Sequence, residues 1–219
     1  MNRHRPPRSP HVLVMAKEPR PGRVKTRLCP ACSPEEAAAV AEAALADTLA
    51  AVAACGAPRK ILALDGEPGA WLPPGFDVVR QRGDDFNQRL VEAWNAAGGP
   101  GLQLGMDTPQ VTAPELDELL TRLDTADAVL GHAFDGGWWV IGWRGADPAA
   151  MFSGVPMSTA NTGRAQEARI LALGLRLHRA APKRDIDTLD DLATVARDFP
   201  RLRTARLARA LARPRDVVA

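Results

Sequence analysis

The sequence of 219 residues predicts an α/β fold, a three-layer α/β/α sandwich around a mostly parallel sheet. Short apolar runs rich in β-branched residues, typical of buried strands, alternate along it with stretches that carry helix start and stop signals. Strands that alternate with helices favour a parallel sheet covered on both faces. No internal repeat or interdomain linker interrupts the pattern, so we expect one domain over residues 11–219, preceded by a flexible basic tail over residues 1–10.

The first strand is expected at 11–16, and a loop rich in Pro, Gly and basic residues follows it over 17–28. Ser33-Pro34-Glu35-Glu36 begins a helix, because Ser suits the N-cap, Pro the first helical position and Glu the third. This Ala-rich helix should run to about Cys55 and end at Gly56. The other expected elements are strands at 60–64, 76–81, 101–106, 128–134, 138–143 and 175–179, and helices at 86–97, 112–123, 161–173, 188–198 and 201–213.

Composition excludes several classes of protein. With 46% hydrophobic and 25% charged residues, the chain is unlike disordered, collagen-like or disulfide-scaffold sequences. The 28 basic and 26 acidic side chains are too evenly balanced to predict a nucleic-acid or membrane partner. No apolar run approaches the ~20 residues that span a bilayer, and the opening ten residues do not resemble a signal peptide. Three cysteines, an odd number, fit a reducing compartment, so we expect a cytoplasmic protein.

The loop after the first strand is the strongest functional signal. It holds five cations within about a dozen residues, and it includes Lys17 and Lys25, two of only four lysines in the chain. Cations on a flexible loop with accessible backbone N–H groups suit a di- or triphosphate. The Gly-Lys-Ser/Thr order of a Walker loop is missing. A solvated basic turn is the alternative interpretation.

Aspartates follow other predicted strands, at the sheet edge where α/β proteins bind ligands. Asp107 leaves a buried strand and could ligate a hard divalent cation, although an Asp that begins a turn is common. Asp185 and Asp187 alternate in an extended segment and would point to one side, so Asp187 could supply a second carboxylate. Asp187 or Thr188 as a helix N-cap is the competing explanation. Asp135 opens an Asp-Gly-Gly turn that suits either close approach of a ligand or a structural hairpin.

Other reactive residues form weaker patterns. Cys29 and Cys32 have the spacing of a redox motif, but the motif follows the basic loop rather than a strand, and no second Cys or His pair completes a zinc site. The four histidines are scattered, and none pairs with a Ser or Cys as a nucleophile triad would require.

Together, four motifs resemble a largely uncharacterised family of transferases with the GT-A, nucleotide-diphospho-sugar transferase fold. The motifs are Ala-Lys-x-Pro-x-Pro-Gly-x-Val-Lys-Thr-Arg-Leu, Gly-x-Asp-x-Pro, Asp-Gly-Gly and Asp-Ile-Asp-Thr-x-x-Asp-Leu. Some members are described as radical-SAM/selenodomain-associated transferases or glycosyltransferases. Molybdenum-cofactor and phospholactate guanylyltransferases are more distantly similar. The resemblance covers about residues 11–192 and is specific for the family rather than for one reaction.

The resemblance implies a role for each matched residue. Lys17, Arg23, Lys25 and Arg27 would cradle nucleotide phosphates, Asp107 and Asp187 would ligate the metal, and Asp85 and Arg89 would lie near the site. The sequence departs from the family at three places: Asn87 replaces a usual Gly, Trp138-Trp139 replaces Tyr residues, and Met157 stands where Trp is common.

We therefore expect a Mg²⁺- or Mn²⁺-dependent transferase that acts on a nucleoside triphosphate or a nucleotide sugar and on a small acceptor. Lys25 and Asp107 would be catalytic, with Lys25 stabilising the leaving group, and Asp135 would orient or deprotonate an acceptor hydroxyl. Three alternatives remain open at this stage. They are a non-catalytic nucleotide-sensing module, a dithiol oxidoreductase using Cys29 and Cys32, and a basic helix over 201–213 that binds acidic partners.

Overall fold

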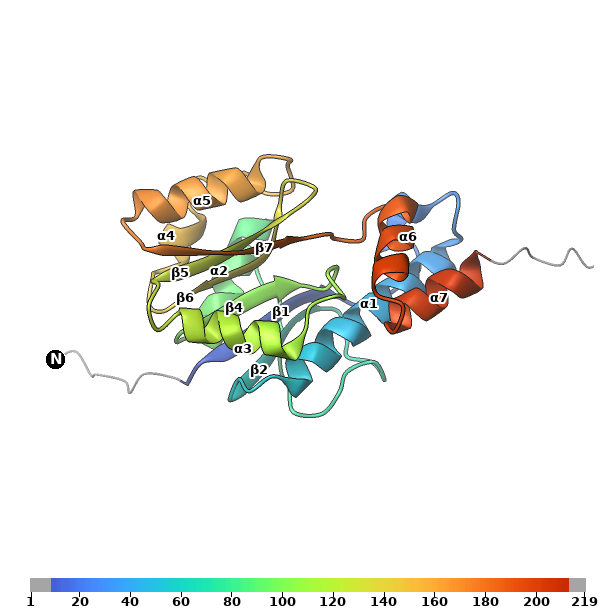
Figure 1. Cartoon of the computed structure of the whole chain (residues 1–219), viewed down its shortest axis with the longest axis horizontal. Coiled ribbons are helices and arrows are strands. Elements are labelled where there is room, and N and C mark those ends of the chain that lie inside the picture. Colours follow the sequence, from blue (N-terminus) through green and yellow to red (C-terminus); the bar gives the residue numbers. More distant parts are fainter. Residues whose placement is uncertain (1–8, 213–219) are drawn as a thin grey trace, which may run out of the picture.

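The computed structural model describes residues 9–212, and within them a seven-stranded sheet forms the centre of the molecule (Figure 1). Its strand order is β3-β2-β1-β4-β6-β5-β7, and β6 runs antiparallel to both neighbours while the other described pairs are parallel. The strands are β1 (His11–Lys17), β2 (Arg59–Asp65), β3 (Asp77–Arg80), β4 (Gly101–Gly105), β5 (Ala128–Ala133), β6 (Trp138–Trp143) and β7 (Leu177–Lys183). The predicted fold class, with its mostly parallel sheet, is confirmed.

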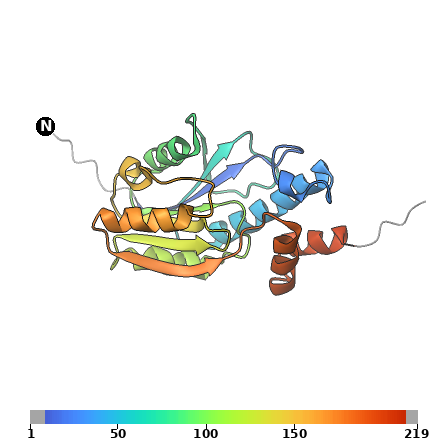
Figure 2. The same cartoon turned by 90° about the horizontal axis from the view of Figure 1, so that it is seen from above.

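Helices cover both faces of this sheet. Alternate residues of each strand point to opposite faces, so each buried strand contributes apolar side chains to both layers. Val12 and Val14 of β1 pack in the main core, between the sheet and helices α1 and α3, whereas Leu13 and Met15 pack on the other face beneath α2, α4 and α5. Figure 2 shows the molecule from above, with α2 and α5 on the same side of the sheet. These helices are α1 (Pro34–Ala54), α2 (Phe86–Ala97), α3 (Ala113–Arg122), α4 (Pro148–Phe152) and α5 (Thr162–Ala172).

The last two described helices, α6 (Leu189–Asp198) and α7 (Arg203–Leu211), lie at one end of the molecule against α1 (Figures 1 and 2). They share a separate small core with Leu28, which ends a short 3-10 helix, η1 (Thr26–Leu28), and with Ile186. Asp47 of α1 accepts hydrogen bonds from the backbone N–H groups of Arg203 and Thr204 at 3.0 and 2.9 Å, which caps the start of α7. The small core thus joins the basic loop to the segment that carries Asp185 and Asp187.

Side-chain capping confirms the helix starts predicted from sequence. Ser33 accepts from the Glu36 N–H at 3.2 Å while the Glu36 carboxylate accepts from the Ser33 N–H at 2.8 Å. Thr112 caps α3, and Thr188 caps α6 with Asp191 as the reciprocal partner. Thr188 rather than Asp187 is therefore the N-cap of α6, which leaves the Asp187 carboxylate free for other contacts.

The predicted elements need correction at one strand and at two short helices. β7 runs from Leu177 to Lys183 instead of 175–179, because it is an edge strand, where Pro182 can sit without removing an internal ladder hydrogen bond. The five-residue helix α4 and the 3-10 helix η1 were not predicted, since each is too short to show a periodic pattern. Of the expected tail, residues 1–8 lie outside the described part of the chain, as does Arg213 at the end of the expected basic helix.

The expectation that no apolar run approaches the length of a membrane span is wrong for α1. Among the described residues, α1 alone is long and apolar enough, by length and composition, to cross a membrane. More than half of its most apolar window is buried, and Leu45 and Leu49 pack in the main core. Its apolar character therefore matches its place between the sheet and the C-terminal helices.

Candidate functional site

A cavity of about 820 Å³ opens at the edge of the sheet where the parallel strands end. The segments after β1, β3, β4, β5 and β7 all contribute to its wall, as expected for ligand sites in open α/β sheets. Every residue that the sequence proposed for the site lines this cavity: Lys17, Arg23, Lys25, Arg27, Asp85, Arg89, Asp107, Asp135 and Asp187. The structure thus brings the proposed residues together around one cavity.

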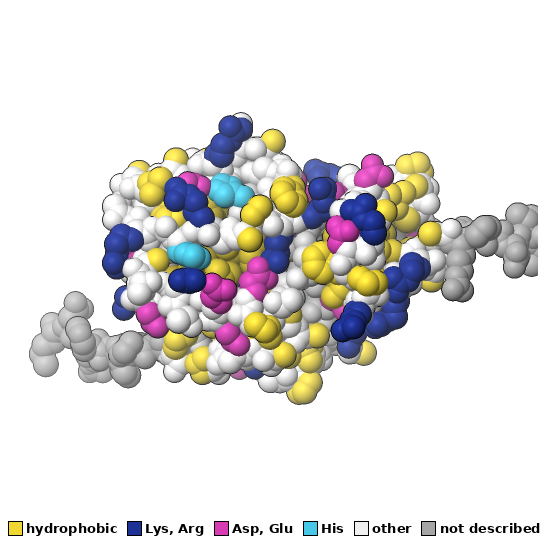
Figure 3. All heavy atoms as spheres, viewed as in Figure 1, with side chains coloured by type: hydrophobic (Ala, Val, Ile, Leu, Met, Phe, Trp, Pro, Cys, Tyr) yellow, Lys and Arg dark blue, Asp and Glu magenta, His cyan; other side chains and the backbone are white. Residues whose placement is uncertain are grey.

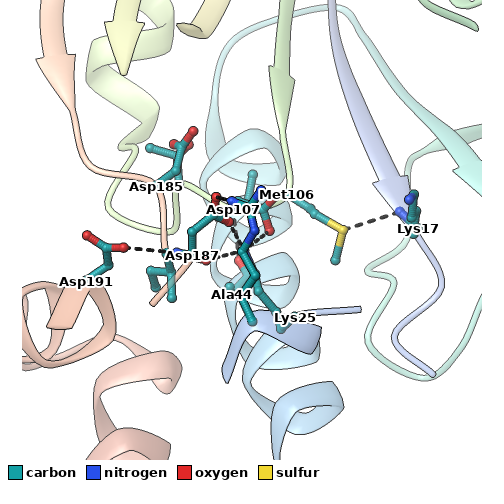
Figure 4. A network of polar contacts seen from close by, with 12 residues as sticks. Lys17, Lys25, Ala44, Met106, Asp107, Asp185, Asp187 and Asp191 are labelled. Atoms are coloured by element: carbon teal, nitrogen blue, oxygen red, sulfur yellow. Dashed lines mark hydrogen bonds and ion pairs between the residues drawn. The ribbon is translucent and has the colours of Figure 1, made fainter. Parts of the chain in front are cut away.

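The centre of the site is an ion-pair cluster around Lys25 (Figure 4). The Lys25 ammonium lies 2.7 Å from Asp107 Oδ1 and 3.3 Å from Asp187 Oδ1, and its side chain is only 6% exposed. It also donates a hydrogen bond to the backbone carbonyl of Ile186. Arg27 Nη1 contacts the other oxygen of Asp187 at 3.0 Å. The carboxylates of Asp107 and Asp187 therefore converge on one buried cation.

Backbone contacts explain why these distant segments meet. The Ile186 N–H donates to the Asp107 carbonyl at 3.0 Å, which fixes the acidic segment against the end of β4. The Ile186 side chain is fully buried in the small core together with Leu28. Lys25, three positions before Leu28, adopts a left-handed backbone conformation with φ 50°. Packing of Leu28 and Ile186 thus holds the basic loop and the acidic segment face to face.

Burial and neighbouring charges shift the pKa values of two groups at the site, Lys25 and Asp185. Burial alone would lower the pKa of Lys25, but Asp107 and Asp187 outweigh it and hold that pKa above its usual value. Burial, with added repulsion from Asp107 and Asp135, raises the pKa of Asp185 to about 7, although Thr108 Oγ1 donates to its carboxylate at 2.6 Å. Asp185 therefore keeps its proton up to about neutral pH, beside the ion-pair cluster.

The donor set fits a hard divalent cation with few protein ligands. Two carboxylates already share a cation here, and oxygen is the ligand atom that Mg²⁺ and Mn²⁺ prefer. Within residues 9–212 no group of three or more His, Cys, Asp or Glu side chains could enclose a metal. Water and ligand oxygens would have to complete the coordination, which is how Mg²⁺ is commonly bound beside phosphates.

The remaining proposed residues occupy the rim and the far wall. Lys17 and Arg23 are exposed, so their charges can reach a ligand. Asp85 Oδ1 accepts from the Gln88 N–H at 2.8 Å and caps α2, which accounts for Asp85 structurally. Arg89 Nη1 lies 3.5 Å from Asp65 Oδ2.

The opposite wall joins the β5–β6 turn to the start of α5. Asp135 Oδ1 accepts from the Gly137 N–H at 2.8 Å and stays exposed. Gly136 has φ 93°, and a methyl group there would lie 2.1 Å from the Ala160 carbonyl oxygen. Ser158 also lines the cavity and has a positive φ of 59°. Sequence reasoning did not propose Ser158, because nothing in its local pattern distinguishes it from an ordinary loop serine.

The first two of the three tryptophans of β6, Trp138 and Trp139, differ in exposure. Trp139 is 1% exposed, packs in the main core and donates from its indole N–H to the Ala181 carbonyl at 2.9 Å. Trp138 is only partly buried and contributes to the cavity wall. Of the two rings, Trp138 is therefore the one with a surface available to a ligand.

The features behind two alternative functions lie away from this cavity. Cys29 and Cys32 are not joined by a disulfide; Cys32 is buried in the small core, and Cys29 packs against it. On α7, Arg206 and Arg209 are exposed, and Figure 3 shows basic side chains over the α6–α7 end of the molecule. Their guanidinium groups donate to the carbonyls of Arg201 and Pro200, contacts that a solvated helix face provides without any partner.

Known structures share this fold. A protein from Desulfovibrio desulfuricans G20, provisionally described as a nucleotide-diphospho-sugar transferase, is 27% identical with a TM-score of 0.84, over 92% of this chain and 96% of its own. A nucleotidyl transferase from Methanothermobacter thermautotrophicus is 20% identical with a TM-score of 0.56, over 88% of this chain and 98% of its own. Rv0371c from Mycobacterium tuberculosis H37Rv in complex with manganese is 18% identical with a TM-score of 0.51, over 86% and 98%. The expected likeness to nucleotide-diphospho-sugar transferases is thus confirmed as a likeness of fold.

Sequence comparison gives the family. No curated protein matches the chain. Residues 37–159, more than half of the chain, match the model of the DUF2064 family, described as uncharacterized proteins conserved in bacteria. The chain therefore belongs to the DUF2064 family and has the fold of the nucleotide-diphospho-sugar transferases.

Proposed function

We propose that this protein is a divalent-metal-dependent transferase that takes a group from a nucleotide-activated donor and passes it to a small acceptor. The donor is a nucleoside triphosphate, which gives up a nucleotidyl group, or a nucleotide sugar, which gives up a glycosyl group. The observation that carries the proposal is the convergence of Asp107 and Asp187 on one cation, in the wall of a cavity lined by the basic loop. The fold shared with nucleotidyl and nucleotide-sugar transferases supports it.

Asp107 and Asp187 would hold Mg²⁺ or Mn²⁺, and the manganese complex of Rv0371c supports a metal of this class. A divalent cation so held would neutralise phosphate charge and so favour departure of the leaving group. The exposed cations Lys17 and Arg23 would bind the polyphosphate, with Arg27 beside Asp187. Positioning and charge stabilisation carry most of the catalysis in such transfers, which agrees with a cavity built from cations and carboxylates.

The acceptor would lie against the wall formed by the Asp135 turn and the start of α5. Asp135 uses one carboxylate oxygen to accept from the Gly137 N–H, and the other remains available to an acceptor hydroxyl. It would orient that hydroxyl, or take its proton as the new bond forms. Trp138 and Ser158 line the same region and would contribute to acceptor recognition.

A donor panel tests this proposal. The protein is incubated with Mg²⁺, with each nucleoside triphosphate or nucleotide sugar, and with a mixture of small phosphorylated and hydroxylated acceptors. Release of pyrophosphate identifies nucleotidyl transfer, and release of a nucleoside diphosphate identifies glycosyl transfer. A non-catalytic nucleotide-sensing module predicts instead a rise in melting temperature with one nucleotide and Mg²⁺ but no turnover. If no donor shows binding or turnover, the proposal is contradicted.

A further inference from the structure

The Lys25 ammonium has no donor left for a ligand. A lysine offers three N–H donors, and three protein oxygens accept here: Asp107 Oδ1, Asp187 Oδ1 and the Ile186 carbonyl. Its side chain is also almost completely buried, whereas Lys17 on the same cavity wall is exposed. Lys25 can therefore contact a phosphate only if it first releases at least one of these oxygens.

The ammonium also occupies one oxygen of each proposed metal ligand. Asp107 and Asp187 point toward Lys25 from two separate segments, as the close-up shows (Figure 4). A divalent cation held by the same two oxygens would compete with the ammonium for them, because two cations that share these oxygens repel each other. Arg27 occupies the second oxygen of Asp187 and adds to this repulsion.

We propose that Lys25 is a resident counter-ion that blocks the carboxylate pair to divalent metals in the nucleotide-free protein. This inference rests on the proposed function, because it takes Asp107 and Asp187 as the metal ligands. A polyphosphate offers new acceptors to Lys25 and Arg27, so its arrival can draw both cations away from the carboxylates. Metal and nucleotide then favour each other's binding, since each is bound best in the state that the other selects.

Binding of Mn²⁺ alone tests the inference, with free Mn²⁺ measured by electron paramagnetic resonance in the absence of nucleotide. Lys25→Met should bind Mn²⁺ at least about tenfold more tightly than the wild type, because the competing charge is gone. Lys25→Arg keeps the charge and should stay close to the wild type. Lys17→Met is the matched control, since it removes one lysine from the same cavity wall without touching the carboxylates.

Three results would support or overturn the inference. Asp107→Asn added to Lys25→Met should cancel the gain, which places the extra binding on the carboxylates. If Lys25→Met is unstable because the acidic pair lacks a partner, Mn²⁺ alone should raise its melting temperature and leave that of the wild type unchanged. Mn²⁺ affinity in Lys25→Met no greater than in Lys17→Met would overturn the inference.

A nucleotide arm separates this claim from the proposed function. Wild-type protein is titrated with Mn²⁺ in the presence of each donor of the panel, and the Mn²⁺ that the same donor binds without protein is subtracted. Tighter Mn²⁺ binding with one donor supports the proposed function, whichever way the Lys25→Met comparison turns out. If no donor changes Mn²⁺ binding while Lys25→Met gains affinity, the counter-ion role stands and the proposed function is contradicted.

Discussion

Asp107 and Asp187 stand 80 positions apart in the chain, yet one oxygen of each lies within 3.3 Å of the same Lys25 ammonium. Two structural facts produce this contact. β4 and β7 end at the same edge of the sheet, and the backbone of Ile186 bonds to the carbonyl of Asp107. The acidic pair is therefore a product of the topology together with one small core, and changes in either should alter it.

Ile186→Ala should weaken both stability and ligand binding. Ile186 is fully buried and connects the acidic segment to the small core, so its truncation should cost about 2–5 kcal/mol of unfolding free energy. Because Asp187 adjoins it, nucleotide binding with Mg²⁺ should weaken as well. Urea unfolding and calorimetric titration measure the two effects. Leu189→Ala, at an exposed apolar position nearby, serves as the control and should change neither by much.

Gly136→Ala should destabilise the wall opposite the basic loop. The residue has φ 93°, and the added methyl group would clash with the Ala160 carbonyl. Gly154→Ala is a matched control, because Gly154 also has a positive φ, 74°, but has open space around it. We expect a cost of about 1 kcal/mol at Gly154 and clearly more at Gly136, measured by urea unfolding. Equal costs at the two positions would mean that Gly136 does not pack closely against the Ala160 backbone before α5.

Asp185→Asn should change how stability depends on pH. The folded protein holds the Asp185 proton up to a pKa of about 7, whereas the unfolded chain loses it near pH 4. Between these values the wild type therefore loses stability as pH rises, by up to about 1.4 kcal/mol per pH unit from this group. The free energy of unfolding of the Asn variant should therefore rise relative to that of the wild type from pH 4 to pH 7. Above pH 7 the difference between the two should stay constant.

The Asp185 prediction is checked by urea unfolding at intervals from pH 4 to pH 8 in buffer containing EDTA. Asp190→Asn, an exposed position in the first turn of α6, controls for the loss of one negative charge from the segment. An advantage of Asp185→Asn that stays the same at every pH would show that the carboxyl group titrates with the same pKa in the folded and unfolded states.

Local signals in the sequence were sufficient to predict most of the fold. Capping residues such as Ser33 and Thr112 act on their own helices, so their chemistry is visible without tertiary information. Alternation likewise placed Asp185 and Asp187 on the same side, and both line the cavity. The end of β7 could not be predicted in this way, because tolerance of Pro182 within a strand depends on that strand lying at an edge, which only the topology reveals.

The internal geometry of the site could not be predicted in the same way. The sequence marked Lys25 as a phosphate ligand and Asp107 as a metal ligand, but it did not indicate that these two residues pair with each other. That contact requires the left-handed turn at Lys25 and the packing of Leu28 against Ile186, which are long-range features. For the same reason, the sequence could not distinguish the partly exposed Trp138 from the buried Trp139, although both contribute to the cavity wall.

The most direct test of the central claim is calorimetric titration of the best donor from the panel, with and without Mg²⁺, into the wild type, Asp107→Asn, Asp187→Asn and the control Asp190→Asn. If the acidic pair holds the metal that bridges to the phosphates, each of the first two substitutions should abolish the Mg²⁺-dependent part of binding, and the control should retain it. Undiminished Mg²⁺-dependent binding by Asp107→Asn would contradict the account.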